Sequence, residues 1–189
     1  VGARIGIPRT FYYEPVVPPG ATTPTGGLPA DQAALMATAI DLLADAGATI
    51  VDPANLPSIL ATNPDDNLLR WGICAGANQA KGMDAGCSVV LKFGFKRDFN
   101  AWLASLGPAS PIDTLTELRE FNLVNAARGA IRYGQSRLDI SDEMDPGDPI
   151  DVARVEADRA KDLRLTATRG IDAAMAGPDG TPGTADDLD

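Results

Sequence analysis

The N-terminal part of the chain pairs two short apolar runs with one long amphipathic segment. Residues 3–8 are apolar and β-branched around Gly6 and end at Pro8, a pattern typical of a buried strand. Residues 29–46 are predicted to form a helix, because apolar side chains recur at spacings of three and four. Residues 48–52 are predicted to form a second strand. A strand, a helix and a strand of this length predict two adjacent parallel strands joined by a right-handed crossover. The apolar positions of this helix are Leu35, Met36, Ala39, Ile40, Leu42 and Leu43.

Helical patterns dominate the middle of the chain. A helix is predicted from about Lys96 to Leu106, where Gly107 and Pro108 end it. The next helix opens with a capping box, in which Thr114 is followed three residues later by Glu117. Residues 125–138 are predicted to continue as helix after a break near Gly129.

A last helix is predicted over about 151–176, and its centre is dense in charge. Arg154 and Asp158 are four residues apart, the spacing of an ion pair on one helix face. One face must be solvated, so we expect this helix on the outside of the fold. Its inward side is predicted to consist of Val152, Val155, Leu163, Ile171 and Met175.

Four stretches lack a clear period. Residues 14–29 are rich in Pro and Gly and predict a surface loop, and residues 53–94 are irregular with short helical pieces. Residues 140–149 are acidic and predict a solvated loop, with a cation site as the alternative. Residues 177–189 predict a turn-rich connector, because they lack the Asp-x-Asp-x-Asp-Gly spacing of a calcium loop.

Composition narrows the classes of function. The 189 residues include 16 basic and 26 acidic side chains, giving a net charge of -10. This balance argues against a nucleic-acid surface and against binding to anionic membranes. No apolar run approaches the ~20 residues that span a bilayer. The loop after the first strand contains neither Gly-x-Gly-x-x-Gly nor Gly-Lys-Ser/Thr, which argues against nucleotide binding.

The residues available for metal binding and nucleophilic catalysis are few. The chain has no histidine, which excludes Ser-His-Asp and Cys-His catalysis from within these residues. The two cysteines, Cys74 and Cys87, cannot build a closed zinc site alone. They are expected either to form a disulfide, as in an exported protein, or to remain two buried thiols. We predict no cofactor and no resident metal.

Two phrases of the N-terminal unit are distinctive. Residues 3–9 read Ala-Arg-Ile-Gly-Ile-Pro-Arg, and residues 46–57 read Ala-Gly-Ala-Thr-Ile-Val-Asp-Pro-Ala-Asn-Leu-Pro. Both resemble the amidase signature family, in the part of its chain that follows the catalytic core. Further phrases resemble the family in its own order and extend the match over nearly the whole chain, at residues 96–103, 114–122, 133–136 and 170–175.

The resemblance implies amide hydrolysis by a Ser nucleophile, a bridging Ser in a cis peptide and a Lys, all from an earlier Gly/Ser-rich segment. No such segment occurs in these residues, so we expect a portion of the enzyme that carries scaffold and substrate-pocket wall but no catalytic residue. Ser136 comes nearest to a nucleophile's context, and the resemblance places it on a helix. The expected pocket wall consists of Phe93, Phe95, Trp102 and Phe121, with core packing as the alternative for each.

The predicted fold is α/β, with a small mixed or parallel sheet covered by several helices, as part of an amidase signature fold. It forms one segment, with a strand-helix-strand unit at 3–52, a mostly helical part at 53–176 and a flexible tail at 177–189. The expected partners are a small-molecule amide substrate in the whole enzyme and either a second copy or the missing catalytic half. The alternative is a free-standing binding or assembly module, or one half of a split enzyme.

Overall fold

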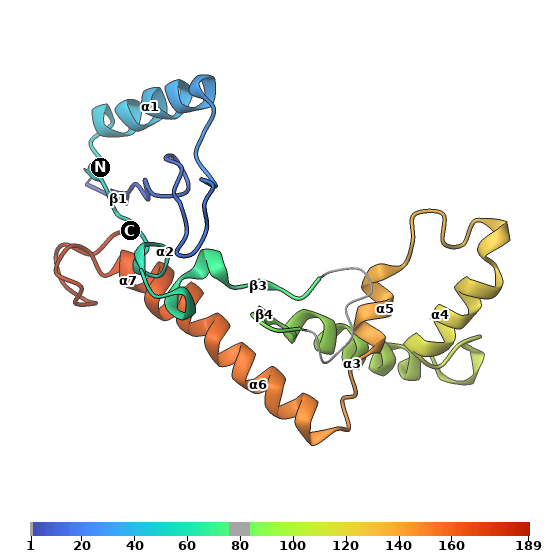
Figure 1. Ribbon diagram of the computed structural model, residues 1–189. Coiled ribbons are helices and arrows are strands. Elements are labelled where there is room, and N and C mark those ends of the chain that lie inside the picture. Colours follow the sequence, from blue (N-terminus) through green and yellow to red (C-terminus); the bar gives the residue numbers. More distant parts are fainter. Residues whose placement is uncertain (1, 76–83) are drawn as a thin grey trace. The chain divides into compact units, whose positions relative to one another are not determined.

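The computed structural model describes residues 2–75 and 84–189 and shows a mixed α/β protein in which helices predominate (Figure 1). The chain divides into two compact units. The first runs to Trp71 and resumes over Lys161–Asp189, and the second comprises Gly72–Ala160. Each unit contains one small parallel sheet of two strands among the described residues, which confirms the predicted α/β class.

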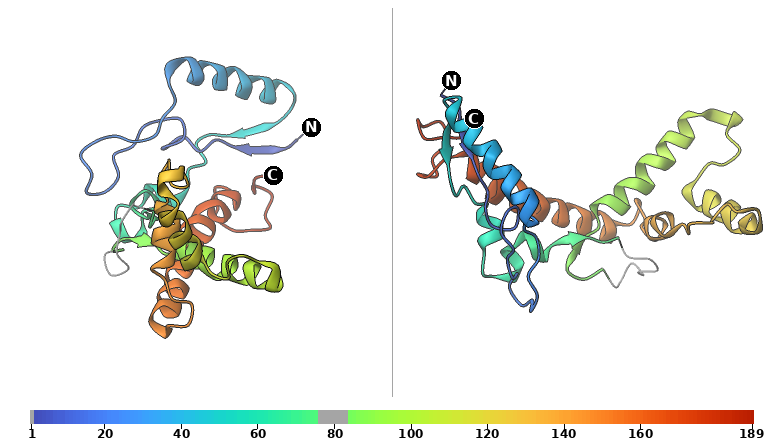
Figure 2. Two further views of the ribbon diagram at one scale, coloured as in Figure 1. Left: turned by 90° about the vertical axis from the view of Figure 1, so that its right-hand side faces the viewer. Right: turned by 90° about the horizontal axis from the view of Figure 1, so that it is seen from above.

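The N-terminal strand-helix-strand unit is confirmed. β1 (Arg4–Gly6) pairs in parallel with β2 (Thr49–Val51), and Ile5 lies opposite Ile50. α1 (Ala30–Asp45) connects the two strands and runs along one side of the pair (Figures 1 and 2). Gly47 follows the helix with a φ of 92°, a left-handed conformation that favours glycine and ends the helix before β2.

The apolar face of α1 is uncovered within the described residues. None of the residues of α1 is buried, and Leu35 and Leu42 are 70% and 64% exposed. Met36 and Leu43 are exposed as well. Packing of an amphipathic face normally supplies most of the stability of a helix in a protein. The periodicity therefore predicts the helix correctly, but its apolar stripe faces solvent in this unit.

The rest of the first unit is built around short helices. α2 (Pro57–Leu60) packs against η6 (Arg164–Ile171), which leads into α7 (Asp172–Met175). Ile59 and Leu165 are buried where these helices meet. Two single-turn helices, η1 (Pro64–Asp66) and η2 (Leu68–Arg70), complete this part.

One buried amide organises the turns around η1 and η2. Asn67 is 1% exposed, and its Nδ2 donates hydrogen bonds to the carbonyls of Ile59 and Ala61 at 3.0 and 2.7 Å. Its Oδ1 accepts from the Leu69 N–H at 2.9 Å. Buried polar groups require such partners, so Asn67 is fixed by the same backbone groups that it holds together.

The C-terminal residues return to the strands of the first unit. The Leu188 N–H donates to the Met175 carbonyl at 2.8 Å, and the Asp189 N–H donates to the Arg4 carbonyl at 2.9 Å. A Cβ atom at Gly6 would overlap the Leu188 side chain. The stretch predicted to be a flexible tail thus has defined hydrogen bonds to α7 and β1.

The second unit packs its helices around a small apolar core. β3 (Gly72–Ile73) pairs in parallel with β4 (Cys87–Ser88), and α3 (Val90–Ser105) follows at once. The buried core consists of Cys74, Val89, Phe93 and Met144, with Cys87, Val152 and Val155 packed against it. Val152 and Val155 belong to α6 (Pro149–Leu163), and their inward orientation was predicted. The other elements are η4 (Gly107–Ala109), α4 (Leu115–Val124), η5 (Ala126–Arg128) and α5 (Ser136–Asp142).

Several predicted helix limits in the second unit are wrong. α3 begins at Val90 rather than near Lys96, because the apolar, β-branched run before Lys92 belongs to the helix. Residues 129–133 form turns and residues 134–135 are irregular instead of helical, since Gly129 and Gly134 adopt positive φ angles of 90° and 75°. Residues 140–142, predicted as loop, close α5 instead. Half of the capping box is confirmed, with Thr114 Oγ1 accepting from the Glu117 N–H at 3.1 Å, whereas the Glu117 carboxylate accepts from the Asp113 N–H and not from the Thr114 N–H.

The predicted inward face of the last helix is wrong in its second half. Leu163 and Ile171 are 54% and 60% exposed, whereas Leu165 is fully buried. For Ile171 the cause is η6, a π-helical stretch that begins after Leu163 and has non-helical φ and ψ at Gly170. A π segment adds residues to each turn and so shifts which side chains share a face.

Candidate functional site

A ligand-sized pocket lies within the second unit, between β3, α3 and α5. Its volume is about 410 Å³, inside the range of roughly 300–1,000 Å³ that small-molecule sites occupy. The lining is mainly apolar, which suits an uncharged organic group better than a polyanion. The lining residues are Ile73, Cys74, Ala75, Leu91, Lys92, Phe95, Arg137, Ile140 and Ser141.

The apolar walls come from the start of α3 and from the strand before it. Leu91 and Phe95 are four residues apart on α3 and therefore share one helix face. Ile73 of β3 and Leu91 are 59% and 55% exposed, so two of the walls are open to solvent. Ile140 of α5 is buried. The pocket thus combines exposed apolar walls with one side closed by packing.

A buried ion pair lies at the floor of this pocket. Lys92 and Asp84 are each 2% exposed, and the Lys92 ammonium donates to Asp84 Oδ2. The same ammonium lies 3.4 Å from Glu143 Oε2. Both carboxylates form ion pairs with the Lys92 ammonium, so its charge is compensated at the floor of the pocket.

The other polar groups of the pocket are occupied by backbone carbonyls. Arg137 Nη1 donates to the Ala75 carbonyl at 2.8 Å, which uses one of the five donors of the guanidinium. Ser141 Oγ donates to the Arg137 carbonyl at 2.7 Å, one turn earlier in α5. The Ser141 hydroxyl proton thus goes to the backbone. The described part of the pocket can bind a ligand but carries no activated nucleophile.

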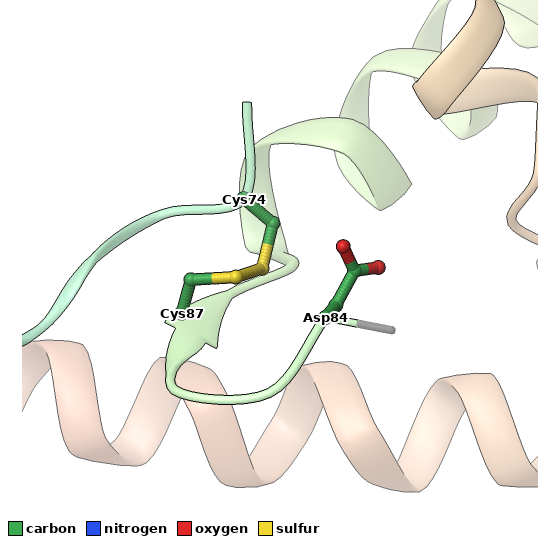
Figure 3. Close-up of side chains that lie close together, drawn as sticks. All are labelled: Cys74, Asp84 and Cys87. Atoms are coloured by element: carbon green, nitrogen blue, oxygen red, sulfur yellow. A yellow bond between two sulfur atoms is a disulfide. The ribbon is translucent and has the colours of Figure 1, made fainter. Parts of the chain in front are cut away.

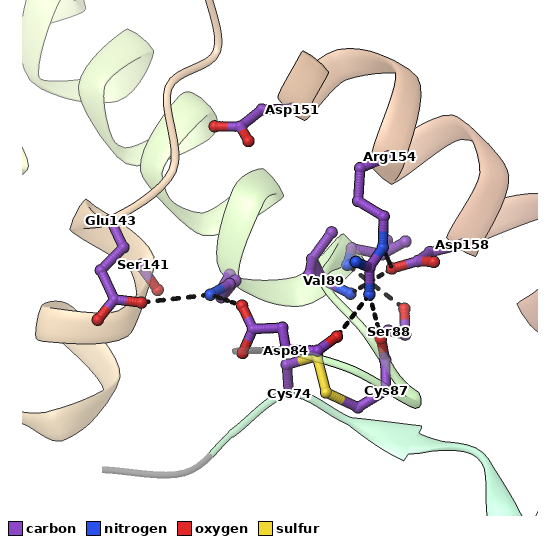
Figure 4. Close-up of polar contacts among 12 residues, drawn as sticks. Cys74, Asp84, Cys87, Ser88, Val89, Ser141, Glu143, Asp151, Arg154 and Asp158 are labelled. Atoms are coloured by element: carbon purple, nitrogen blue, oxygen red, sulfur yellow. Dashed lines mark hydrogen bonds and ion pairs between the residues drawn. A yellow bond between two sulfur atoms is a disulfide. The ribbon is translucent and has the colours of Figure 1, made fainter. Parts of the chain in front are cut away.

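A second network fixes the segment behind the pocket. Cys74 and Cys87 form a disulfide, which decides between the two alternatives left open by the sequence. Arg154 donates from Nη2 to the carbonyls of Asp84 and Cys87 at 2.7 and 3.0 Å, and from Nε to Asp158 at 2.8 Å. The buried Asp158 also accepts from the Val89 N–H at 3.0 Å. The predicted pair of Arg154 and Asp158 is confirmed, and it ties α6 to the start of α3 (Figure 4).

A third polar cluster joins α3, α4 and α5. Arg119 donates to Asp139 and Asp142 at 2.7 and 2.5 Å, and Lys96 lies 3.1 Å from Asp142. Partial burial raises the pKa of Asp142, but hydrogen bonds from Thr116, Arg119 and Lys96 outweigh it and hold that pKa below its ordinary value. These groups pair with one another, so their arrangement points to a structural role.

The four aromatic residues predicted as pocket wall lie in different places in the structure. Phe95 lines the pocket, whereas Phe93 lies in the apolar core. Trp102 and Phe121 are 54% and 57% exposed and lie outside the pocket lining. Phe95 stacks on Phe99 with ring centroids 5.6 Å apart. Ser136 lies on α5, as the resemblance implies.

Sequence reasoning missed the polar floor of the pocket. Lys92 follows an apolar run, and a lysine inside such a run is the one signal that could have indicated burial with a partner. Its partner Asp84 lies in a stretch without periodicity, so no pattern links the two. Arg137 and Ser141 gave no signal, because their contacts are with backbone carbonyls.

Comparison with known proteins adds no constraint on function. No protein-family model matches the chain, and neither a curated protein nor a solved structure matches it. Within residues 2–75 and 84–189, no helix has both the length and the apolar character that crossing a membrane requires.

Proposed function

We propose that this chain is a portion of an amidase signature hydrolase that contributes scaffold and substrate-pocket wall but no catalytic residue. The observation that carries the proposal is the pocket of the second unit, which is ligand-sized and apolar but lacks an activated nucleophile among its described residues. The ordered phrases that resemble the family supply the reaction class, the hydrolysis of a carbon–nitrogen amide bond.

The chemistry of the pocket supports binding and not bond cleavage. Amide hydrolysis needs an activated nucleophile, a base that takes its proton and donors for the oxyanion. Here the Ser141 hydroxyl donates to a backbone carbonyl, and the Lys92 ammonium is held by carboxylates. The apolar walls would contact the substrate's organic group while a catalytic segment supplies the reacting side chains.

The scaffold role is supported by the uncovered surface of the first unit. A sheet of two strands is only marginally stable by itself, and an amphipathic helix needs a partner for its apolar face. α1 leaves Leu35 and Leu42 exposed on such a face. Both features suit an element that packs against further structure in the whole enzyme.

The test is to identify the complete reading frame that encodes this chain and to assay its product on simple aryl and alkyl amides. We expect the complete product to hydrolyse amides and the 189-residue chain to be inactive. In the complete product, Phe95→Ala should raise KM several-fold with a smaller effect on kcat. The matched control is Tyr133→Ala, since Tyr133 is 92% exposed and lies outside the pocket. Turnover by the isolated chain that Ser136→Ala abolishes, or a complete product that hydrolyses no amide, would contradict the proposal.

A free-standing assembly module is the second candidate, and the exposed face of α1 favours it. In this case the isolated chain should self-associate through α1, and Leu35→Glu with Leu42→Glu should return it to a monomer. Sedimentation velocity at micromolar concentration measures this. A wild-type chain that stays monomeric and binds no hydrophobic dye would exclude the assembly role.

A further inference from the structure

Three side chains with metal-binding atoms meet beside the pocket floor in the second unit. The sulfurs of Cys74 and Cys87 and a carboxylate oxygen of Asp84 all lie within 4.8 Å of one another (Figure 3). Cys74 and Asp84 are each 2% exposed, and Cys87 is partly buried. The two sulfurs form a disulfide in this structure. They become potential metal ligands only when that bond is reduced.

One oxygen of the Asp84 carboxylate has no hydrogen-bond partner among the described residues. This oxygen, Oδ1, is buried, whereas Oδ2 accepts from the Lys92 ammonium. A buried oxygen without a hydrogen bond is energetically unfavourable, so its presence calls for an explanation. Metal-ligating carboxylates are commonly held through their second oxygen by another side chain. The contact with Lys92 has this form.

We infer that the reduced protein binds one divalent zinc-type cation through Cys74, Cys87 and Asp84. Thiolate and carboxylate ligands suit Zn²⁺, which takes sulfur at about 2.3 Å and carboxylate oxygen at about 2.0–2.2 Å. Tetrahedral geometry at these lengths separates the two sulfurs by roughly 3.8 Å, so the sulfurs, which are bonded to each other in the oxidised chain, must move apart once the bond is reduced. Three protein ligands leave one position for water.

The charges of the surrounding groups fit a divalent cation. Two thiolates would add two negative charges next to Asp84, Glu143 and Asp158, which Lys92 and Arg154 balance only in part. A divalent cation cancels the two thiolate charges, so the net charge of the cluster equals that of the oxidised form. Binding a metal therefore stabilises the reduced state, whereas two free thiolates would be unfavourable in this buried place.

The chemical steps balance with a phosphine or a thiol as the reductant. A phosphine takes the oxygen of one water molecule and becomes the phosphine oxide, while the disulfide gains two electrons and two protons. The two thiols then release two protons as their sulfurs bind Zn²⁺. The same residues thus hold either a covalent bond or a metal ion, depending on the redox environment.

The test titrates Co²⁺ and then Zn²⁺ into the 189-residue chain without oxygen, after reduction by a phosphine and its removal. Reduced protein should take up one equivalent of Co²⁺ with a thiolate-to-metal charge-transfer band in the near ultraviolet, and Zn²⁺ should remove that band. Oxidised protein should show no band. Cys87→Ser should abolish it, and Asp84→Asn should weaken Zn²⁺ binding by at least about tenfold.

The control is Asp98→Asn, which removes a surface carboxylate of α3 outside the metal site and should leave Zn²⁺ affinity within about threefold. If Asp84→Asn does not fold, X-ray absorption spectroscopy of the zinc-loaded wild type tests the ligand set instead. We expect two sulfur atoms around the metal, with oxygen atoms as the remaining ligands. A reduced chain that unfolds should regain its circular dichroism with Zn²⁺. Absence of the band and of this recovery, wild-type affinity in Asp84→Asn, or a metal environment without two sulfurs would overturn the inference.

Discussion

Removing the charge of Lys92 should destabilise the second unit strongly. The side chains of Lys92 and Asp84 are each 1% exposed. Lys92→Met keeps the length of the side chain but leaves Asp84 buried without its cation. Breaking a buried pair by removing one partner costs about 3–5 kcal/mol, because the remaining charge is uncompensated. The double variant Lys92→Met with Asp84→Asn removes both charges and should recover at least about 2 kcal/mol of this loss.

The assay is urea unfolding of the oxidised chain, followed by the fluorescence of Trp102 in a Trp71→Phe background. Trp102 belongs to the second unit, so the signal reports on the unit that contains the pair. The matched control is Arg97→Met, because Arg97 pairs with Asp98 on the surface at 58% exposure and should cost less than about 1 kcal/mol. A Lys92→Met chain as stable as Arg97→Met, or a double variant no better than the single one, would refute the reasoning.

Three further predictions follow from other parts of the structure. Reducing the disulfide without metal, or Cys87→Ser, should lower the free energy of unfolding by about 3 kcal/mol for a closed loop of this length, measured by urea unfolding. Asn67→Ala should cost about 2–4 kcal/mol in the same assay, since it leaves buried backbone groups without partners. The pKa of Asp142 is lowered in the folded state, so its stabilising effect is complete above its ordinary pKa of 3.8 and is lost as the pH falls through the folded pKa. Asp142→Asn should therefore flatten the acid side of the stability–pH profile, and an unchanged profile would contradict the assigned hydrogen bonds.

The sequence predicted those elements whose structure follows from local periodicity. β1, α1 and β2 could be predicted, because the short apolar, β-branched runs, the helical spacing and the glycine after α1 agree with one another. α1 nevertheless shows the limit of this reasoning. Its stripe correctly indicates a helix, but periodicity does not reveal whether a partner for Leu35 and Leu42 exists.

Elements that depend on backbone conformation or distant partners could not be predicted. Gly129 and Gly134 adopt positive φ angles and replace a predicted helix with turns, yet a glycine inside a helical pattern is ambiguous. The floor of the pocket depends on Lys92 meeting Asp84 across an irregular stretch. The family resemblance indicates Phe95, Trp102 and Phe121 alike as pocket wall, but Phe95 lines this pocket, whereas Trp102 and Phe121 lie outside its lining.

In the second unit, the covalent and ionic contacts gather at the floor of the pocket, whereas its apolar walls are exposed. The disulfide, the pair of Lys92 and Asp84 and the contacts of Arg154 all converge on the segment around β4. Ile73 and Leu91, which form walls, remain more than half exposed. A self-contained binding module would bury the walls of its pocket, since most of a small ligand's surface is covered in such sites. A rigid floor beneath open apolar walls instead suits a pocket that a further segment completes, which favours the pocket-wall role over an independent binding function.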